Sequence, residues 1–163
     1  AAKAAGAGQI IVLEMSRARI AKAKECGADV VINPKEEDPV AAIKALTNGS
    51  GADVSFECIG NKHTGPLAVD VIRNTGTAII VGIFEEPSAF NFFSLSGTDK
   101  KVVGSLTYTI EDFKGLARLM AKGAIKADPL ITGRIGLKDI VDKGFLELIN
   151  NKVENIKILV HPE

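Results

Sequence analysis

The chain has 163 residues, of which 46% are apolar and 25% are charged, and 20 Lys and Arg balance 20 Asp and Glu. This length and composition are typical of one globular domain with a substantial core. The zero net charge gives no sign of a nucleic-acid partner or of attraction to a membrane surface, and no apolar run reaches the ~18 residues of a membrane helix. Cys26 and Cys58 share no C-x-x-C motif, which indicates reduced structural thiols and a cytoplasmic protein.

Short apolar strands alternate with helical segments along the chain. We expect strands at 9–14, 29–33, 52–60, 77–83, 101–108 and 155–161. We expect helices from Ser16 to Gly27, from Asp38 onward, over 65–76, after Thr109, and around 140–149, with an extended connection at 128–135. This alternation predicts an α/β fold with a doubly wound, mostly parallel Rossmann-type sheet.

An irregular stretch, residues 84–100, interrupts the alternation and is rich in Phe. It contains Phe84, Phe90, Phe92 and Phe93. Large apolar patches usually mark contacts, so this stretch is a candidate subunit interface. The alternative is that the rings complete the core of their own domain.

Glu14 ends the first expected strand, and a helix begins two residues later. Ligands of open parallel sheets bind outside the carboxyl ends of the strands. An acid at that place can accept hydrogen bonds from the ribose hydroxyls of adenosine, and its charge would repel a 2′-phosphate. Glu14 is therefore a candidate ribose clamp that favours NAD over NADP, and the alternative is a solvated carboxylate.

The glycine-rich loop that accompanies such an acid is not in this sequence. The acid should stand ~20 residues beyond G-x-G-x-x-G, and counting back from Glu14 passes the first residue. The opening letters AAKAAGAG suit the end of the helix after that loop and do not look like a signal peptide. We therefore expect residues 1–163 to form a cofactor-binding domain that lacks its first strand and glycine-rich loop.

Four segments together resemble zinc-dependent medium-chain alcohol dehydrogenases of the butanediol and sorbitol type: FECIG, NTGTAIIVGIFEEPSAFNFF, DPLITGRI and GFLELINNKVENIKILV. The resemblance covers the whole chain, but only the back part of the family's cofactor domain. It implies NAD as cofactor, hydride transfer between an alcohol or polyol and NAD, and a dimer or tetramer. It places the catalytic zinc in a separate N-terminal domain and no catalytic residue in this chain.

The same resemblance implies cofactor contacts at particular positions. Glu14 would hold the adenosine ribose and Arg19 would line the adenosine site. Lys157 would approach the pyrophosphate, without the two-pronged geometry of the Arg found in some members. The segments implied along the cofactor and its nicotinamide are Cys58, Ile59 and Gly60; Val81, Gly82 and Ile83; and Ser105, Leu106 and Thr107. Taken singly, these glycines could simply end strands, and Arg19 and Lys157 could be solvated.

Zinc needs clustered nitrogen and sulfur ligands, and neither His63 nor His161 shares a motif with a cysteine. The sequence therefore predicts no metal site in this chain and no dehydrogenase activity from it alone. Rival interpretations are a zinc-free NADP-dependent quinone or enoyl reductase of the same superfamily, a methyltransferase, and a non-catalytic nucleotide-binding module.

Overall fold

The computed structural model describes residues 1–162, and the chain divides into two compact units. Unit 1 comprises residues 1–35 and 109–163, of which residue 163 lies outside the described part, and unit 2 comprises residues 36–108.

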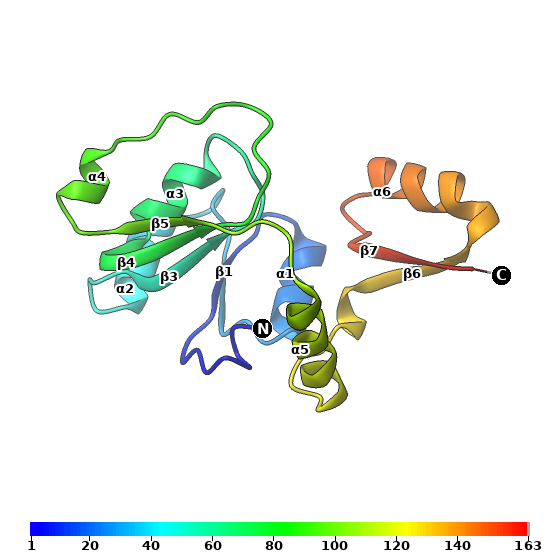
Figure 1. Cartoon of the computed structure of the whole chain (residues 1–163). Helices are drawn as coiled ribbons and strands as arrows, with labels where there is room; N and C mark the ends of the chain where they lie inside the picture. Colours follow the sequence, from blue (N-terminus) through cyan, green and yellow to red (C-terminus); the bar gives the residue numbers. More distant parts are fainter. Residues whose placement is uncertain (163) are drawn as a thin grey trace. The chain divides into compact units, whose positions relative to one another are not determined.

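Unit 2 is built on a three-stranded parallel sheet with the order β3-β4-β5 (Figure 1). Its strands are β3 (Ala52–Glu57), β4 (Ile72–Ile80) and β5 (Lys101–Gly104), and its helices are α2 (Pro39–Leu46), α3 (Thr64–Asp70) and α4 (Phe93–Ser96). Pro39 stands at the start of α2, where its missing N–H costs nothing. The side chain of Asp38 caps this helix by accepting from the N–H of Val40 at 2.9 Å.

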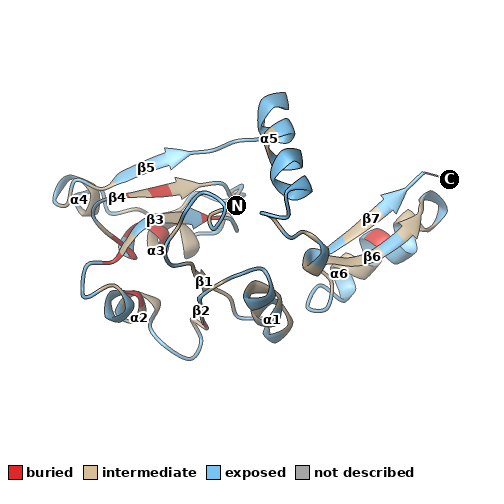
Figure 2. Ribbon diagram, turned by 90° about the horizontal axis from the view of Figure 1, so that it is seen from below, coloured by how far each residue is buried: buried red, intermediate tan, exposed pale blue. Residues whose placement is uncertain are grey.

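The core of unit 2 lies where α3 meets the central strand. Val69 and Ala68 of α3 are buried, and so are Val71, Ile72 and Ala78 along β4. Figure 2 shows the buried positions as red segments around α3 and β4. Burial of these apolar side chains holds α3 against the sheet, because apolar contact is the main favourable term in folding.

Unit 1 contains two further parallel pairs. β1 (Ile11–Leu13) pairs with β2 (Val30–Ile32) through the crossover helix α1 (Arg17–Glu25). β6 (Ile131–Gly136) pairs with β7 (Lys157–His161). Between β6 and β7 lie the 3-10 turn Leu137–Asp139, a π-helical stretch Ile140–Phe145 and α6 (Leu146–Asn150).

The longest helix of unit 1 is α5 (Ile110–Ala121), and its start follows directly from local sequence. The Thr109 hydroxyl accepts from the N–H of Asp112, while the Asp112 carboxylate accepts from the N–H of Thr109 at 2.8 Å. This is the capping box that the sequence predicts. A 3-10 turn, Asp128–Leu130, precedes β6.

The α/β class and the mostly parallel pairing are confirmed. A single continuous sheet is not confirmed. Within residues 1–162 the strands form three separate sheets, and no strand pairs with the free edge of β1 or of β3. No helix in this part of the chain has the length and apolar character needed to cross a bilayer.

Two local predictions are wrong, and a third, at the first eight residues, is supported. The helix expected over 65–76 ends at Asp70, and the buried β-branched pair Val71–Ile72 leads into β4 instead. The first eight residues are short turns with the hydrogen bonds of a helix end, as the sequence predicts: the N–H of Ala5 donates to the Ala1 carbonyl at 2.9 Å, the N–H of Ala7 donates to the Ala2 carbonyl at 3.1 Å, and Gly6 has φ 91°. The segment expected as an extended connection, 128–135, mostly forms β6 because β7 pairs with it.

Candidate functional site

The three parallel strands of unit 2 end at one edge of their sheet, and a short strand-end segment follows each of them. These segments are 58–60 after β3, 81–83 after β4 and 105–107 after β5. They lie side by side: the N–H groups of Val81 and Gly82 donate to the Glu57 carbonyl at 2.8 and 2.9 Å, and the N–H of Ser105 donates to the Ile80 carbonyl at 2.8 Å. Nine of the predicted site residues are therefore brought together at the edge where parallel sheets bind ligands.

Two glycines allow the first two segments to touch backbone to backbone. A Cβ on Gly60 would lie 2.2 Å from the carbonyl oxygen of Ile83, and Gly60 has φ 83°. A Cβ on Gly82 would lie 2.3 Å from the nitrogen of Gly60. No side chain fits at either position, so these glycines do more than end a strand.

Exposed apolar side chains gather on the same segments. Ile59, Ile83 and Leu106 are 64%, 75% and 78% exposed, and Val81 is exposed as well. The neighbouring Thr107 is β-branched but has φ 59°, a strained conformation of the kind that clusters at ligand sites. This edge offers an apolar surface to a flat ring and backbone groups to polar substituents.

Glu57, the last residue of β3, is only 3% exposed. Its Oε1 atom accepts from the N–H groups of Ile59 and Gly60, both at 2.9 Å, and from the hydroxyl of Thr64 at 2.6 Å. Burial of the carboxylate raises its pKa, but these hydrogen bonds outweigh that effect and hold the pKa below its ordinary value. Sequence analysis assigned no role to Glu57, although an acid closing an apolar strand was the available signal.

Comparison with known proteins shows the family of this chain. The family model for zinc-binding dehydrogenases matches residues 1–122. The chain belongs to the zinc-binding dehydrogenase family.

Relatives of this chain include proteins named (R,R)-butanediol dehydrogenase. The chain is 37% identical to the one from Neisseria gonorrhoeae, over 94% of the chain and 44% of that protein. It is 31% identical to a sorbitol dehydrogenase from Bacillus subtilis, over 99% of the chain and 46% of that protein. The chain thus spans a little under half the length of these relatives.

Solved structures agree with that family. The crystal structure of 2R,3R-butanediol dehydrogenase from Bacillus subtilis matches with a TM-score of 0.89 and 34% identity, over 99% of this chain and 46% of that one. An Escherichia coli oxidoreductase of unknown specificity matches with a TM-score of 0.91 and 28% identity, with the same coverage of both chains.

The zinc implied by the family name does not fit the residues present. No group of three or more His, Cys, Asp and Glu side chains within residues 1–162 could hold a metal ion. Burial raises the pKa of the Cys58 thiol, and the charge of Glu57 raises it further, which disfavours the thiolate that zinc binds. We therefore assign no part of the reaction to zinc bound by the described residues.

The remaining predicted site residues belong to unit 1. Glu14 follows β1, and its Oε1 atom accepts from the N–H groups of Met15 and Ser16 at 2.8 and 2.9 Å. Arg19 is exposed on α1, and its guanidinium donates to the Lys152 carbonyl at 3.0 Å. Lys157 is exposed at the start of β7, in a different sheet from β1.

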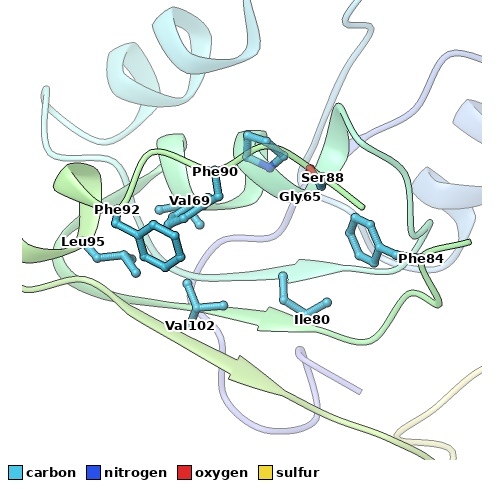
Figure 3. A pocket seen from close by; sticks show the side chains of 10 residues that line it. Gly65, Val69, Ile80, Phe84, Ser88, Phe90, Phe92, Leu95 and Val102 are labelled. Carbon is cyan, nitrogen blue, oxygen red and sulfur yellow. The ribbon is translucent and has the colours of Figure 1, made fainter. Parts of the chain in front are cut away.

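A second feature of unit 2 is an apolar cavity of about 280 Å³ beneath the Phe-rich stretch. Figure 3 shows it between α3, β4, β5 and the loop that leads to α4, with the side chains of Val69, Ile80 and Val102 near the rings of Phe84 and Phe92. The rings of Phe90 and Phe92 meet edge to face, with centroids 5.4 Å apart. Phe84 and Phe90 are thus half-buried against their own unit, whereas Phe92 and Phe93 remain exposed.

Proposed function

We propose that this chain is the NAD(H)-binding portion of a zinc-dependent dehydrogenase that acts on a secondary alcohol or polyol of the butanediol or sorbitol type. The observation that carries the proposal is the set of three adjoining strand-end segments in unit 2, with two obligatory glycines and an exposed apolar surface. Family membership and the names of the relatives supply the reaction class.

NAD, when bound, supplies the acceptor for the hydride of the alcohol. The residues of this chain would hold it. Ile59, Ile83 and Leu106 offer apolar contact for the nicotinamide, and backbone groups of the strand-end segments are available to its carboxamide. Glu14 would accept from the adenosine ribose with its other oxygen, Oε2, while Arg19 and Lys157 would provide positive charge toward the adenosine and pyrophosphate.

The proposal also covers domain organisation, localisation and assembly. We assign residues 1–163 to one cofactor-binding domain, with zinc supplied by another part of the intact enzyme. We also propose a cytoplasmic homo-oligomer, dimeric or tetrameric. The sequence indicated the Phe-rich stretch as its interface, and from the structure we propose the edge strand β5, which follows that stretch. The support for pairing is that no strand within residues 1–162 covers the outer edge of β5 and that all four of its residues are exposed.

Isothermal titration of the chain with NAD, NADP and S-adenosylmethionine tests the cofactor assignment. We expect binding of NAD, weaker binding of NADP because of the Glu14 charge, and no binding of S-adenosylmethionine. Preference for NADP would favour the zinc-free reductase, and preference for S-adenosylmethionine would favour the methyltransferase. If the chain binds none of the three ligands, the proposed function is wrong.

A further inference from the structure

Glu57 bonds to both glycine-containing segments of the candidate site. Its side chain holds Ile59 and Gly60 through Oε1, and its main-chain carbonyl accepts from Val81 and Gly82. The same Oε1 atom also accepts from Thr64, the first residue of α3. The positions of three chain segments therefore depend on one buried acid.

The other carboxylate oxygen makes this arrangement costly. Oε2 is buried and makes no hydrogen bond of good geometry among the described residues, although the nearby N–H of Gly82 helps to lower the pKa of the carboxylate. It lies 2.4 Å from the point that a Cβ on Gly82 would occupy, so it packs directly against that residue. A buried oxygen without a partner costs free energy, and an apolar side chain would often serve stability better at such a place.

We propose that Glu57 is a positioning residue, whose buried carboxylate sets the geometry of segments 58–60 and 81–83 and thereby of the nicotinamide end of the cofactor site. The inference rests on the proposed function, because it takes NAD as the ligand of this edge. The Glu57 carboxylate accepts from the N–H groups of segment 58–60 and packs against Gly82 of segment 81–83. It would therefore act on the cofactor only through these two segments. Glu14 and Arg19, to which we assign the adenosine end, belong to unit 1, whereas Glu57 belongs to unit 2.

The test compares a ligand that has a nicotinamide with one that lacks it. NADH and ADP-ribose are titrated into the chain and into its Glu57→Ala and Glu57→Gln variants, with Glu86→Ala, an exposed acid of the loop after β4, as the matched control. We expect Glu57→Ala to weaken NADH binding about 10-fold, equivalent to ~1.4 kcal/mol, with the ADP-ribose affinity unchanged within about 2-fold, well under that step. Glu57→Gln should recover most of the NADH affinity because its amide oxygen can still accept from Ile59, Gly60 and Thr64.

The shift of bound NADH fluorescence gives a second readout, and it should change in Glu57→Ala but not in Glu86→Ala. If Glu57→Ala does not fold, Thr64→Val removes one of the three donors to Oε1, and we expect a smaller loss in the same direction. Equal weakening of NADH and ADP-ribose, or no weakening of either, overturns the positioning role. A wild-type chain that binds neither ligand overturns the proposed function itself.

Discussion

Two acids at strand ends have different surroundings in this protein. Glu14 is half-buried and uses one oxygen to accept from the N–H groups of Met15 and Ser16, just before α1. Glu57 is buried and bonds inward to the backbone of its own unit. We therefore propose that Glu14 contacts the cofactor directly, whereas Glu57 holds segments that contact it.

Glu14→Ser should move cofactor preference from NAD toward NADP. The substitution removes a negative charge that would oppose a 2′-phosphate, while a Ser hydroxyl can still accept from the N–H of Ser16. We expect the difference in binding free energy between the two cofactors to change by ~1–3 kcal/mol, the scale of a charged hydrogen bond. Titration of both cofactors measures it, with Glu25→Ser at the end of α1 as the control. An unchanged NAD-to-NADP ratio would contradict the clamp.

The stability of the protein should depend on pH through Glu57. Its folded-state pKa is held below the ordinary value, so its contribution is complete above the unfolded-state pKa of ~4.3 and is lost as the pH falls through the folded-state pKa. The difference in unfolding free energy between wild type and Glu57→Gln should therefore be largest near neutral pH and shrink below pH ~4.

Urea unfolding of both proteins between pH 7 and pH 3 checks this expectation. The N–H of Ile10 lowers the pKa of Asp29, and the N–H of Thr109 lowers that of Asp112. Both acids are unchanged in the variant, so the difference isolates Glu57. A difference that stays constant over this range would show that the Glu57 carboxylate is not the titrating group.

At the scale of elements, the contact between segments 58–60 and 81–83 depends on the absence of side chains. Gly82→Ala would place a Cβ 2.3 Å from the Gly60 nitrogen and 2.4 Å from Glu57 Oε2. We expect a loss of at least ~1–3 kcal/mol of unfolding free energy, as in an overpacked core. Gly104→Ala, at the end of β5, meets nothing within 4 Å and should change stability by less than ~0.5 kcal/mol. Thermal and urea unfolding compare the two, and equal stabilities would contradict the close contact.

The proposed assembly depends on the edge strand β5. The N–H of Ser105 donates to β4, so by alternation the N–H groups of Val102 and Gly104 point to the free edge. Val103 is 48% exposed, and Val103→Lys places a charge on this strand, which opposes strand pairing between copies.

Analytical ultracentrifugation should show a smaller species for Val103→Lys at a concentration where wild type associates. Val153→Lys, with a similar 53% exposure in unit 1, should leave the mass unchanged. A folded Val103→Lys protein that associates as wild type does would place the interface elsewhere.

At the scale of the whole molecule, we propose that the zinc of the reaction is supplied from outside this chain. The described residues contain no group that could hold a metal ion, and a high thiol pKa makes Cys58 a poor zinc ligand. We expect the 163-residue chain to retain no zinc after dialysis and to show no alcohol-dependent reduction of NAD. Metal analysis and absorbance of NADH check both. One tightly held zinc per chain together with activity would contradict the proposal.

Local sequence signals determined the class of the fold and several of its boundaries. Asp38 before Pro39 and Thr109 before Asp112 mark helix starts correctly, because a cap bonds to N–H groups two or three residues away. The position of Glu14 at a strand end likewise follows from a short apolar run. The resemblance of separate segments to the dehydrogenases also required only the sequence.

Only the tertiary structure decided the features that depend on residues distant in the chain. The pairing of β6 with β7 turns an expected connection into a strand, and buried Val71 and Ile72 end a helix early. The fit of Gly82 against Gly60 and the burial of Glu57 join residues more than twenty positions apart. Propensities and caps act over one helical turn, whereas burial and close backbone contact arise when separate strands are packed into one sheet, and these contacts form the candidate site.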